Sequence, residues 1–212
     1  MIKVGVLISG GGTNLQAIID AIASGALDAQ IGVVVSNVAG AGGLERARKA
    51  GIPAIHVNHK AFADRCAFDT ALVNVLEAHN VEWIVLAGFM RIVTHVLLNA
   101  FPMRVVNIHP SLLPAFKGVD APAQAHRYGV RVAGCTVHFV DDGTDTGPIL
   151  AQAAVPVLDD DDETALRERI LTAEHILLPQ ALQWIAQGRV VVDPPRTPGE
   201  RARVTVRGES DA

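Results

Sequence analysis

The chain has 212 residues and a formal net charge of −4, with 50% hydrophobic but only 4% aromatic residues. This length accommodates one large domain, and the aliphatic composition suits the core of a buried parallel sheet. The acidic balance and the lack of a basic run argue against a nucleic-acid partner, so any anionic ligand must be held by local groups. The sequence shows no secretory leader and no apolar stretch of membrane-spanning length. We therefore expect a cytoplasmic protein without a membrane partner.

The first half of the chain alternates between apolar runs and segments of helical periodicity. The expected strands cover 2–8, 31–35, 53–57 and 83–87, and the expected helices begin near residue 13 and cover 42–50 and 62–79. Strands that alternate with helices are typical of a parallel sheet with right-handed crossovers. The sequence thus predicts an α/β fold, Rossmann-like, in which a single domain has a mostly parallel twisted sheet with helices on both faces.

A glycine turn follows the first expected strand, at residues 9–12, and Thr13 and Asn14 are candidates to cap the next helix. Free backbone N–H groups and the positive end of a helix dipole make such a turn a ready anion site. The match to a dinucleotide fingerprint is poor, because Leu15 stands where a glycine is needed and the second strand ends in Ser36-Asn37 rather than an acid. The P-loop lysine is also missing. A phosphate on a smaller ligand remains the best interpretation.

The strand expected at 105–109 carries two polar side chains, Asn107 and His109, on the same face. Pro110 cannot donate to a ladder and keeps the preceding residue extended, so the strand should end with His109 at its carboxyl edge. Ligands bind at that edge in open α/β sheets. The alternative is a lone histidine satisfied in a polar turn, but an asparagine, a histidine and a proline together favour a functional site.

Other polar residues are placed at the same kind of edge. Arg91 follows the strand at 83–87, where a surface arginine and a ligand contact are equally good interpretations. A strand at 134–140 leads into a turn at 141–148 that contains Asp145. Aspartates in turns usually bond their own backbone, so on its sequence context alone Asp145 is an ordinary turn residue.

The last third of the chain is expected to hold a strand at 149–157 and a long helix after the acidic run 159–163. That run could bind a metal, but acids in a first helical turn favour a capping role, and we expect no metal. Glu174 falls on the apolar stripe of the helix and needs a partner, and Pro179 should kink the helix beside it. We predict one domain over 1–193 and a disordered tail over 194–212, with Cys66 and Cys135 as reduced thiols.

Four segments together resemble a known family, phosphoribosylglycinamide formyltransferase, the folate-dependent enzymes of purine synthesis. The resemblance extends over about residues 1–191. The segments are Ser-Gly-Gly-Gly-Thr-Asn-Leu-Gln at 9–16, Leu-Ala-Gly-Phe-Met-Arg at 86–91, Asn-Ile-His-Pro-Ser-Leu-Leu-Pro at 107–114, and Asp-Gly-Thr-Asp-Thr-Gly-Pro at 142–148. The third is typical of 10-formyltetrahydrofolate-dependent enzymes as a group, and the first narrows the resemblance to this family. The loop at 117–122 departs from some relatives, which carry a histidine-rich stretch there.

The resemblance implies roles for individual residues. It implies formyl transfer from 10-formyltetrahydrofolate, a co-substrate, to the amine of N1-(5-phospho-D-ribosyl)glycinamide, without a metal, in a monomer or homodimer whose partners are small molecules. The implied catalytic residues are Asn107, His109 and Asp145; the implied ribonucleotide contacts are Gly12, Thr13, Asn14 and Glu174; the implied folate contacts are Arg65, Met90, Arg91, Ile92, Val93 and Asn107.

The chemistry of the residues agrees with that implication. Formyl transfer to an amine passes through a tetrahedral oxyanion, and a carboxamide and an imidazole on one strand face are suitable preorganised donors. Two alternatives stay open. A formyltetrahydrofolate hydrolase or methionyl-tRNA formyltransferase would use the same three residues, although we expect such enzymes to carry a further domain. A non-catalytic module that binds a small anion at the glycine turn is the other.

Overall fold

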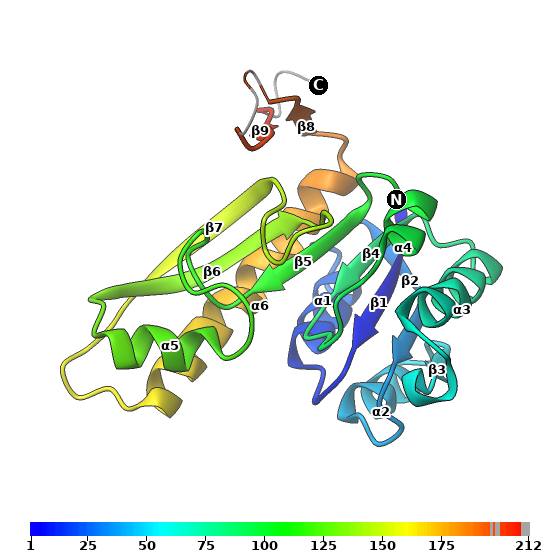
Figure 1. Ribbon diagram of the computed structural model, residues 1–212, viewed down its shortest axis with the longest axis horizontal. Helices are drawn as coiled ribbons and strands as arrows, with labels where there is room; N and C mark the ends of the chain where they lie inside the picture. The colour runs from blue at the N-terminus through cyan, green and yellow to red at the C-terminus, as the bar shows by residue number, and fades with distance from the viewer. Residues whose placement is uncertain (196, 198–199, 209–212) are drawn as a thin grey trace. The chain divides into compact units, whose positions relative to one another are not determined.

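The computed structural model describes residues 1–195, 197 and 200–208. Its seven-stranded sheet has the order β3-β2-β1-β4-β5-β6-β7, and a separate two-stranded sheet pairs β8 with β9 (Figure 1). The chain divides into two compact units, Met1–Asn107 and Ile108–Ala212, and the boundary falls inside β5 (Val105–His109). Each unit is described separately below.

The first unit is built from parallel strands joined by helices. β1 pairs in parallel with β2 and β4, β2 with β3, and β4 with β5. Its strands are β1 (Ile2–Ile8), β2 (Ala29–Ser36), β3 (Ala54–His56) and β4 (Trp83–Leu86), followed by the first part of β5. Its helices are α1 (Thr13–Ala23), α2 (Gly42–Lys49), the short 3-10 helix η1 (His59–Ala61), α3 (Arg65–Ala78) and α4 (His95–Ala100). The predicted α/β class with a mostly parallel sheet is confirmed.

Helices cover both faces of the sheet in this unit. A Cβ added at Gly5 of β1 would lie 2.4 Å from Leu76 of α3, whereas a Cβ added at Gly43 of α2 would lie 2.3 Å from Ile8 of β1. Gly5 and Ile8 are an odd number of residues apart, so their side chains project to opposite faces. α3 therefore packs on one face and α2 on the other, and the glycine at each contact lets the helix approach closely.

The second unit pairs two antiparallel strands with a long helix. β6 (Val132–Phe139) and β7 (Ile149–Pro156) form the antiparallel pair, and α6 (Glu163–Ala186) packs on both of them. α5 (Ala121–Tyr128) contacts α6. The fully buried apolar residues of α6 include Leu178 and Leu182 on either side of Pro179, and the helix continues through that proline to Ala186.

The ends of two helices and the C-terminal tail can be compared with what the sequence predicted. Thr13 and Asn14 lie inside α1, whose N-cap is Gly12, so no side chain caps that helix. The acidic run does cap α6, because the Asp162 carboxylate accepts the Ala165 N–H at 2.7 Å. Part of the expected disordered tail is a strand: β9 (Arg203–Val206) pairs with β8 (Val190–Asp193). Residues 196, 198–199 and 209–212 of that tail lie outside the described residues.

Candidate active site

The site begins at the end of β5, where His109 is buried and Asn107 is half-buried. Both belong to one strand and lie two positions apart, so strand alternation places their side chains on one face and that of the buried Ile108 on the other. The imidazole Nε2 of His109 lies 2.9 Å from the carbonyl oxygen of Phe116, in the loop that follows the strand. This contact fixes the ring plane of His109 at the carboxyl edge of the sheet.

Asp145 lies beside His109, although the two residues are far apart in the sequence. The carboxylate oxygen Oδ2 is 3.5 Å from His109 Nδ1 and accepts the Gly118 N–H at 2.7 Å. The backbone of Asp145 has a φ of 53°, in the left-handed region that non-glycine residues rarely adopt. Residues held in such conformations concentrate at functional sites, so the backbone and the carboxylate contacts favour a site role over an ordinary turn role.

The ordinary turn role belongs to a neighbouring aspartate. Asp141 Oδ1 accepts the Gly143 N–H at 3.1 Å and the Thr146 hydroxyl at 2.6 Å, so this side chain organises its own turn. Both carboxylates come from one loop, yet only Asp145 reaches across to the end of β5. The structure thus distinguishes two aspartates that the sequence could not.

A second histidine, which the sequence reasoning missed, flanks the same carboxylate. His138 Nε2 on β6 lies 3.7 Å from Asp145 Oδ1, and its Nδ1 lies 2.8 Å from the Phe139 carbonyl oxygen. Burial lowers the pKa of His138 below its usual value, against the opposing effects of that carbonyl and of the Asp145 charge. A histidine at an inward position of an alternating strand was the available signal. Asp145 therefore lies between two imidazoles.

The protons in this cluster are constrained by geometry. Both ring nitrogens of His109 face oxygen acceptors, the Phe116 carbonyl and the Asp145 carboxylate. Only a ring with a proton on each nitrogen can donate to both. A distance of 3.5 Å is long for such a bond in the absence of substrate, and catalytic hydrogen bonds commonly tighten once substrate is present. The arrangement can polarise a carbonyl through His109 and accept a proton at Asp145.

The segment after His109 is tied to β6 and β7. The Thr136 hydroxyl donates to the Ser111 carbonyl at 2.6 Å and accepts the Leu113 N–H at 3.1 Å. The Gln152 amide group donates to the Leu113 carbonyl and to the Thr136 hydroxyl, each at 2.9 Å. Because Thr136 is fully buried, these bonds form inside the unit and hold the residues after the strand in one conformation.

The glycine turn of the first unit leads into α1 without a side-chain cap. Gly12, the N-cap residue, has a φ of 72°, and a Cβ there would lie 2.5 Å from the Cα of Gly43. Thr13 is half-buried and Asn14 is buried. No side-chain hydrogen bond caps the first turn of α1, which is the arrangement expected of an anion site.

The predicted folate residues of the first unit have different environments. Met90 and Ile92 are exposed, Val93 is buried, Arg91 is half-buried and Arg65 is exposed at the start of α3. In the same segment, the Thr94 N–H and hydroxyl both donate to Oδ2 of the buried Asp69 on α3, at 2.5 and 2.8 Å. Asp69 was not predicted from sequence. Burial raises its pKa, while the Thr94 bonds and the nearby charges of Arg65 and Arg91 act in the opposite direction.

Ser9, which follows β1, is hydrogen-bonded to the residues that follow β2 and β4. The Ser9 hydroxyl donates to Asn37 Oδ1 at 2.6 Å and accepts the Met90 N–H at 2.8 Å. The residue that opens the glycine turn therefore also holds the residues that follow β2 and β4. The turn and the Met90–Val93 segment are thereby parts of one hydrogen-bonded edge within this unit.

Glu174 is buried on α6, as its position on the apolar stripe indicated. Burial raises the pKa of the Cys135 thiol to about 12, and the charge of Glu174 adds to that rise. Cys135 is therefore a poor nucleophile at neutral pH. Among the described residues, no group of three or more His, Cys, Asp or Glu side chains could hold a metal ion. In the described part of the chain, no helix is long and apolar enough to cross a membrane.

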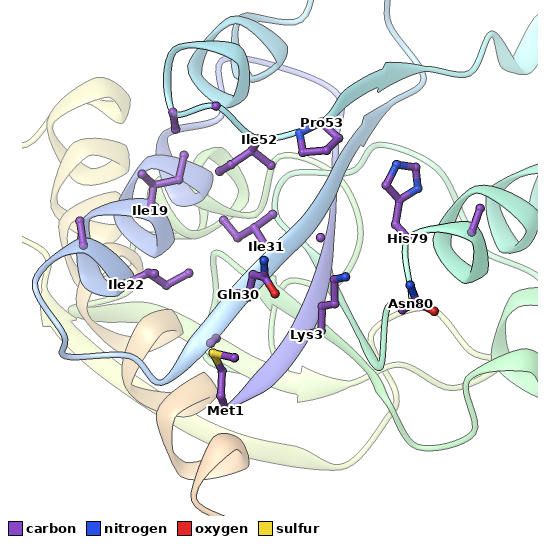
Figure 2. Close-up of a pocket in the computed structure, with 16 residues that line it drawn as sticks. Met1, Lys3, Ile19, Ile22, Gln30, Ile31, Ile52, Pro53, His79 and Asn80 are labelled. Atoms are coloured by element: carbon purple, nitrogen blue, oxygen red, sulfur yellow. The ribbon is translucent and has the colours of Figure 1, made fainter.

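A cavity of about 870 Å³ lies elsewhere in the first unit (Figure 2). It opens near the amino ends of β1 and β2, where Met1, Lys3, Gln30 and Ile31 line it together with Ile19 and Ile22 of α1. Its lining includes none of the predicted site residues. This cavity is thus separate from the candidate site residues of this unit, which lie at the carboxyl ends of the strands.

The comparisons with known proteins identify the family to which the chain belongs. Residues 2–182 match the family model described as formyl transferase. The chain belongs to the formyl transferase family. A phosphoribosylglycinamide formyltransferase from Bacillus subtilis is 42% identical over 185 residues, which cover 87% of this chain and 95% of that protein. A trifunctional purine biosynthetic protein adenosine-3 from Chironomus tentans is 52% identical over 190 residues, but this chain spans only 14% of its length.

Solved structures share the fold as well. The crystal structure of glycinamide ribonucleotide transformylase 1 from Symbiobacterium toebii matches with a TM-score of 0.92 and 52% identity, covering 97% of this chain and 94% of that one. Phosphoribosylglycinamide formyltransferase from Anaplasma phagocytophilum matches with a TM-score of 0.88 and 40% identity, covering 98% and 94%. These solved structures are of formyl-transferring enzymes, and the mostly parallel α/β fold expected from the sequence is the fold that they share with this chain.

Proposed function

We propose that this enzyme transfers the formyl group of 10-formyltetrahydrofolate to the amine of N1-(5-phospho-D-ribosyl)glycinamide, a step of purine synthesis. The observation that carries the proposal is the contact of Asp145 with His109, two residues after Asn107, in a member of the formyl transferase family. The relatives that are similar over nearly their whole length are phosphoribosylglycinamide formyltransferases. The co-substrates are small molecules, and we infer a cytoplasmic enzyme that acts as a monomer or homodimer.

Asn107 and His109 stabilise the transition state in this proposal. As the amine nitrogen bonds to the formyl carbon, negative charge develops on the formyl oxygen. The carboxamide of Asn107 donates one hydrogen bond to that oxygen. The Nε2–H of His109 donates the other, with the formyl oxygen taking the place of the Phe116 carbonyl, which lies 2.9 Å from Nε2 in this structure. His109 is buried, and electrostatic interactions are stronger in a buried site than in water. A hydrogen bond from His109 therefore stabilises the developing oxyanion more than the same bond would in solvent.

Asp145 is the general base in this proposal and takes part in proton transfer. The attacking amine loses one proton when it becomes an amide, and the folate nitrogen N10 gains one when its bond to the formyl carbon breaks. Asp145 accepts the first proton and then passes a proton to N10, directly or through solvent, so the site returns to its starting state. The Gly118 N–H at 2.7 Å holds the carboxylate in place while its charge changes.

The binding residues complete the proposal. The uncapped start of α1, with Gly12, Thr13 and Asn14, holds the ribonucleotide phosphate, and the Glu174 carboxylate binds elsewhere on that substrate. Arg65 and the segment Met90–Val93 bind the formyl donor.

An acceptor panel tests the proposed function. Purified protein is incubated with 10-formyltetrahydrofolate, and loss of the formyl group is followed by folate absorbance with the ribonucleotide, with methionyl-tRNA, or with water alone as acceptor. We expect rapid turnover with the ribonucleotide only. Turnover without an acceptor would indicate a hydrolase, turnover with the tRNA would indicate a methionyl-tRNA formyltransferase, and no turnover with any of the three would contradict a formyl-transfer function.

A further inference from the structure

The back of the glycine turn is held by α2, which the sequence gave no reason to connect with ligand binding. The Gly43 N–H donates to the Gly10 carbonyl at 3.1 Å, and Arg46 Nε donates to the Gly11 carbonyl at 2.8 Å. The same guanidinium reaches the side-chain oxygen of Gln16 on α1 at 3.2 Å through Nη1. Two consecutive carbonyls of the turn therefore point toward α2.

The direction of these carbonyls fixes the direction of the amides that follow them. In a trans peptide unit the C=O and N–H bonds point to opposite sides. Because the carbonyls of Gly10 and Gly11 point to α2, the N–H groups of Gly11 and Gly12 point away from it. The Gly12 carbonyl is also committed, since it accepts the Gln16 N–H at 3.0 Å inside α1. The next amide, that of Thr13, is one of the free donors at the start of the helix.

The glycine turn packs closely against α2 at Gly12 and Gly43. A Cβ at Gly12 would lie 2.5 Å from the Gly43 Cα, and a Cβ at Gly43 would lie 3.2 Å from the Gly12 Cα. By contrast, a Cβ at Gly10 or Gly11 would meet no atom within 4 Å. The turn is thus packed tightly against α2 on one side and open on the other.

We propose that Arg46 is a positioning residue for phosphate binding: it holds the Gly11 carbonyl, with the Gly43 N–H holding the Gly10 carbonyl, so that the amides of Gly11, Gly12 and Thr13 converge on the ribonucleotide phosphate. This inference rests on the proposed function for the identity of the ligand. Arg46 acts through the backbone, and its charge adds to the attraction for a dianion. Amides oriented before the ligand arrives need no reorganisation on binding, so removing Arg46 should weaken binding and leave catalysis intact.

Arg48 provides a matched control on the same helix. It is exposed and forms an ion pair with Glu45 on its own helix, at 3.6 Å. Arg46→Met and Arg48→Met each remove one positive charge, so the general attraction for an anion falls equally in both. Arg46→Lys keeps the charge and one donor group. Only the variants at Arg46 change the bond to the Gly11 carbonyl.

Steady-state kinetics provide the first readout. For Arg46→Met we expect the KM for the ribonucleotide to rise about tenfold or more, the loss typical of one hydrogen bond to a charged group, with kcat and the KM for the formyl donor near wild type. Arg48→Met should stay within about twofold of wild type, and Arg46→Lys should fall between the two. An unchanged KM in Arg46→Met would overturn the inference. So would a matching fall in kcat and thermal midpoint, which would indicate a structural role only.

Binding of inorganic phosphate provides a readout that needs no activity. In amide NMR spectra of the wild-type protein, added phosphate should shift the Gly11, Gly12 and Thr13 signals, and Arg46→Met should require about tenfold more phosphate for the same shift. If the protein proved inactive with the ribonucleotide but these shifts and their dependence on Arg46 remained, the proposed function would fail and the positioning role would stand. If phosphate left these signals unmoved in the wild-type protein, the positioning role would fall whatever the activity.

Discussion

The glycine turn after β1 and the cluster at the end of β5 are both polar sites at the carboxyl ends of strands, but they are made of different parts of the chain. In the proposed function the turn binds through backbone amides, and a Cβ at Gly12 would come within 2.5 Å of α2. The cluster acts through side chains in that proposal, with the carboxylate of Asp145 between His109 and His138. A backbone site is damaged by added atoms, whereas a side-chain site is damaged by lost groups. Substitutions should therefore affect affinity at the turn and turnover at the cluster.

The sharpest expectation of that contrast concerns Asn107. Asn107→Ala should lower kcat about 10²-fold, because it removes one preorganised donor to the oxyanion, while both KM values change little. Steady-state kinetics on the purified variant test this. A variant that raised only KM would make Asn107 a binding residue. It would contradict the expectation that substitutions in the cluster affect turnover rather than affinity.

The turn should show the opposite pattern. Gly11→Ala adds a methyl group on the open side, where no atom lies within 4 Å, so the protein should fold normally. We expect a loss of ribonucleotide affinity of about tenfold with kcat nearly unchanged, since the methyl group obstructs the phosphate rather than the reacting atoms. Isothermal titration with the ribonucleotide measures it. Gly12→Val is the severe comparison, because it adds atoms against Gly43 at a φ of 72° and should also lower the thermal midpoint.

Substitutions of Asp69, a buried residue of α3 outside both regions, should change the free energy of unfolding. Asp69→Ala leaves the half-buried Thr94 donors without their acceptor and should cost about 1–3 kcal/mol of unfolding free energy. Asp69→Asn keeps an acceptor oxygen and removes the buried charge, so we expect less than about 1 kcal/mol of change at pH 7. Urea denaturation of the two variants tests this pair. Equal losses would mean that the charge, and not the hydrogen bonding to Thr94, matters.

The smallest expected effect is a pH dependence of stability from His138. Because burial lowers the pKa of His138 in the folded state, the unfolded chain takes up a proton that the folded chain refuses. The unfolding free energy should fall as pH drops below 6.5, by at most about 1.4 kcal/mol per pH unit from this group, and should be unaffected by it above that pH. Urea midpoints at pH 5.5 and 7.5 should converge in His138→Gln. If the difference between the two midpoints were the same in the variant as in the wild type, His138 would not be a source of the pH dependence.

Sequence reasoning reached the fold because the apolar runs and helical periodicities of the first unit are regular. It also placed Asn107 and His109 on one face at a strand end, since strand alternation and Pro110 fix both points locally. It could not bring Asp145 to His109 from spacing, because that contact depends on how the turn after β6 folds back in the second unit. The resemblance to a family supplied that pairing, and the geometry is consistent with it.

Other contributors had no local signature at all. Arg46 lies on a helix that reads as an ordinary amphipathic segment, and its bond to the Gly11 carbonyl appears only once α2 is packed on the turn. Asp69 reads as one polar residue among several in α3, and its burial depends on the Thr94 segment. β9 escaped prediction because its region is rich in arginine, glycine and proline, and the pairing with β8 is a tertiary outcome.

A single-turnover measurement on Asp145→Asn tests the central claim most directly, with Asp141→Asn from the same turn as the control. Enzyme in excess over a ¹³C-formyl-labelled donor, at a concentration well above the Kd of that donor, is mixed with saturating ribonucleotide, and the label on the ribonucleotide is followed by rapid quench. We predict that Asp145→Asn binds both substrates and transfers the label about 10³-fold more slowly than wild type, while Asp141→Asn stays within a few-fold. Transfer at the wild-type rate by a folded Asp145→Asn enzyme would contradict the account and make Asp145 a turn residue.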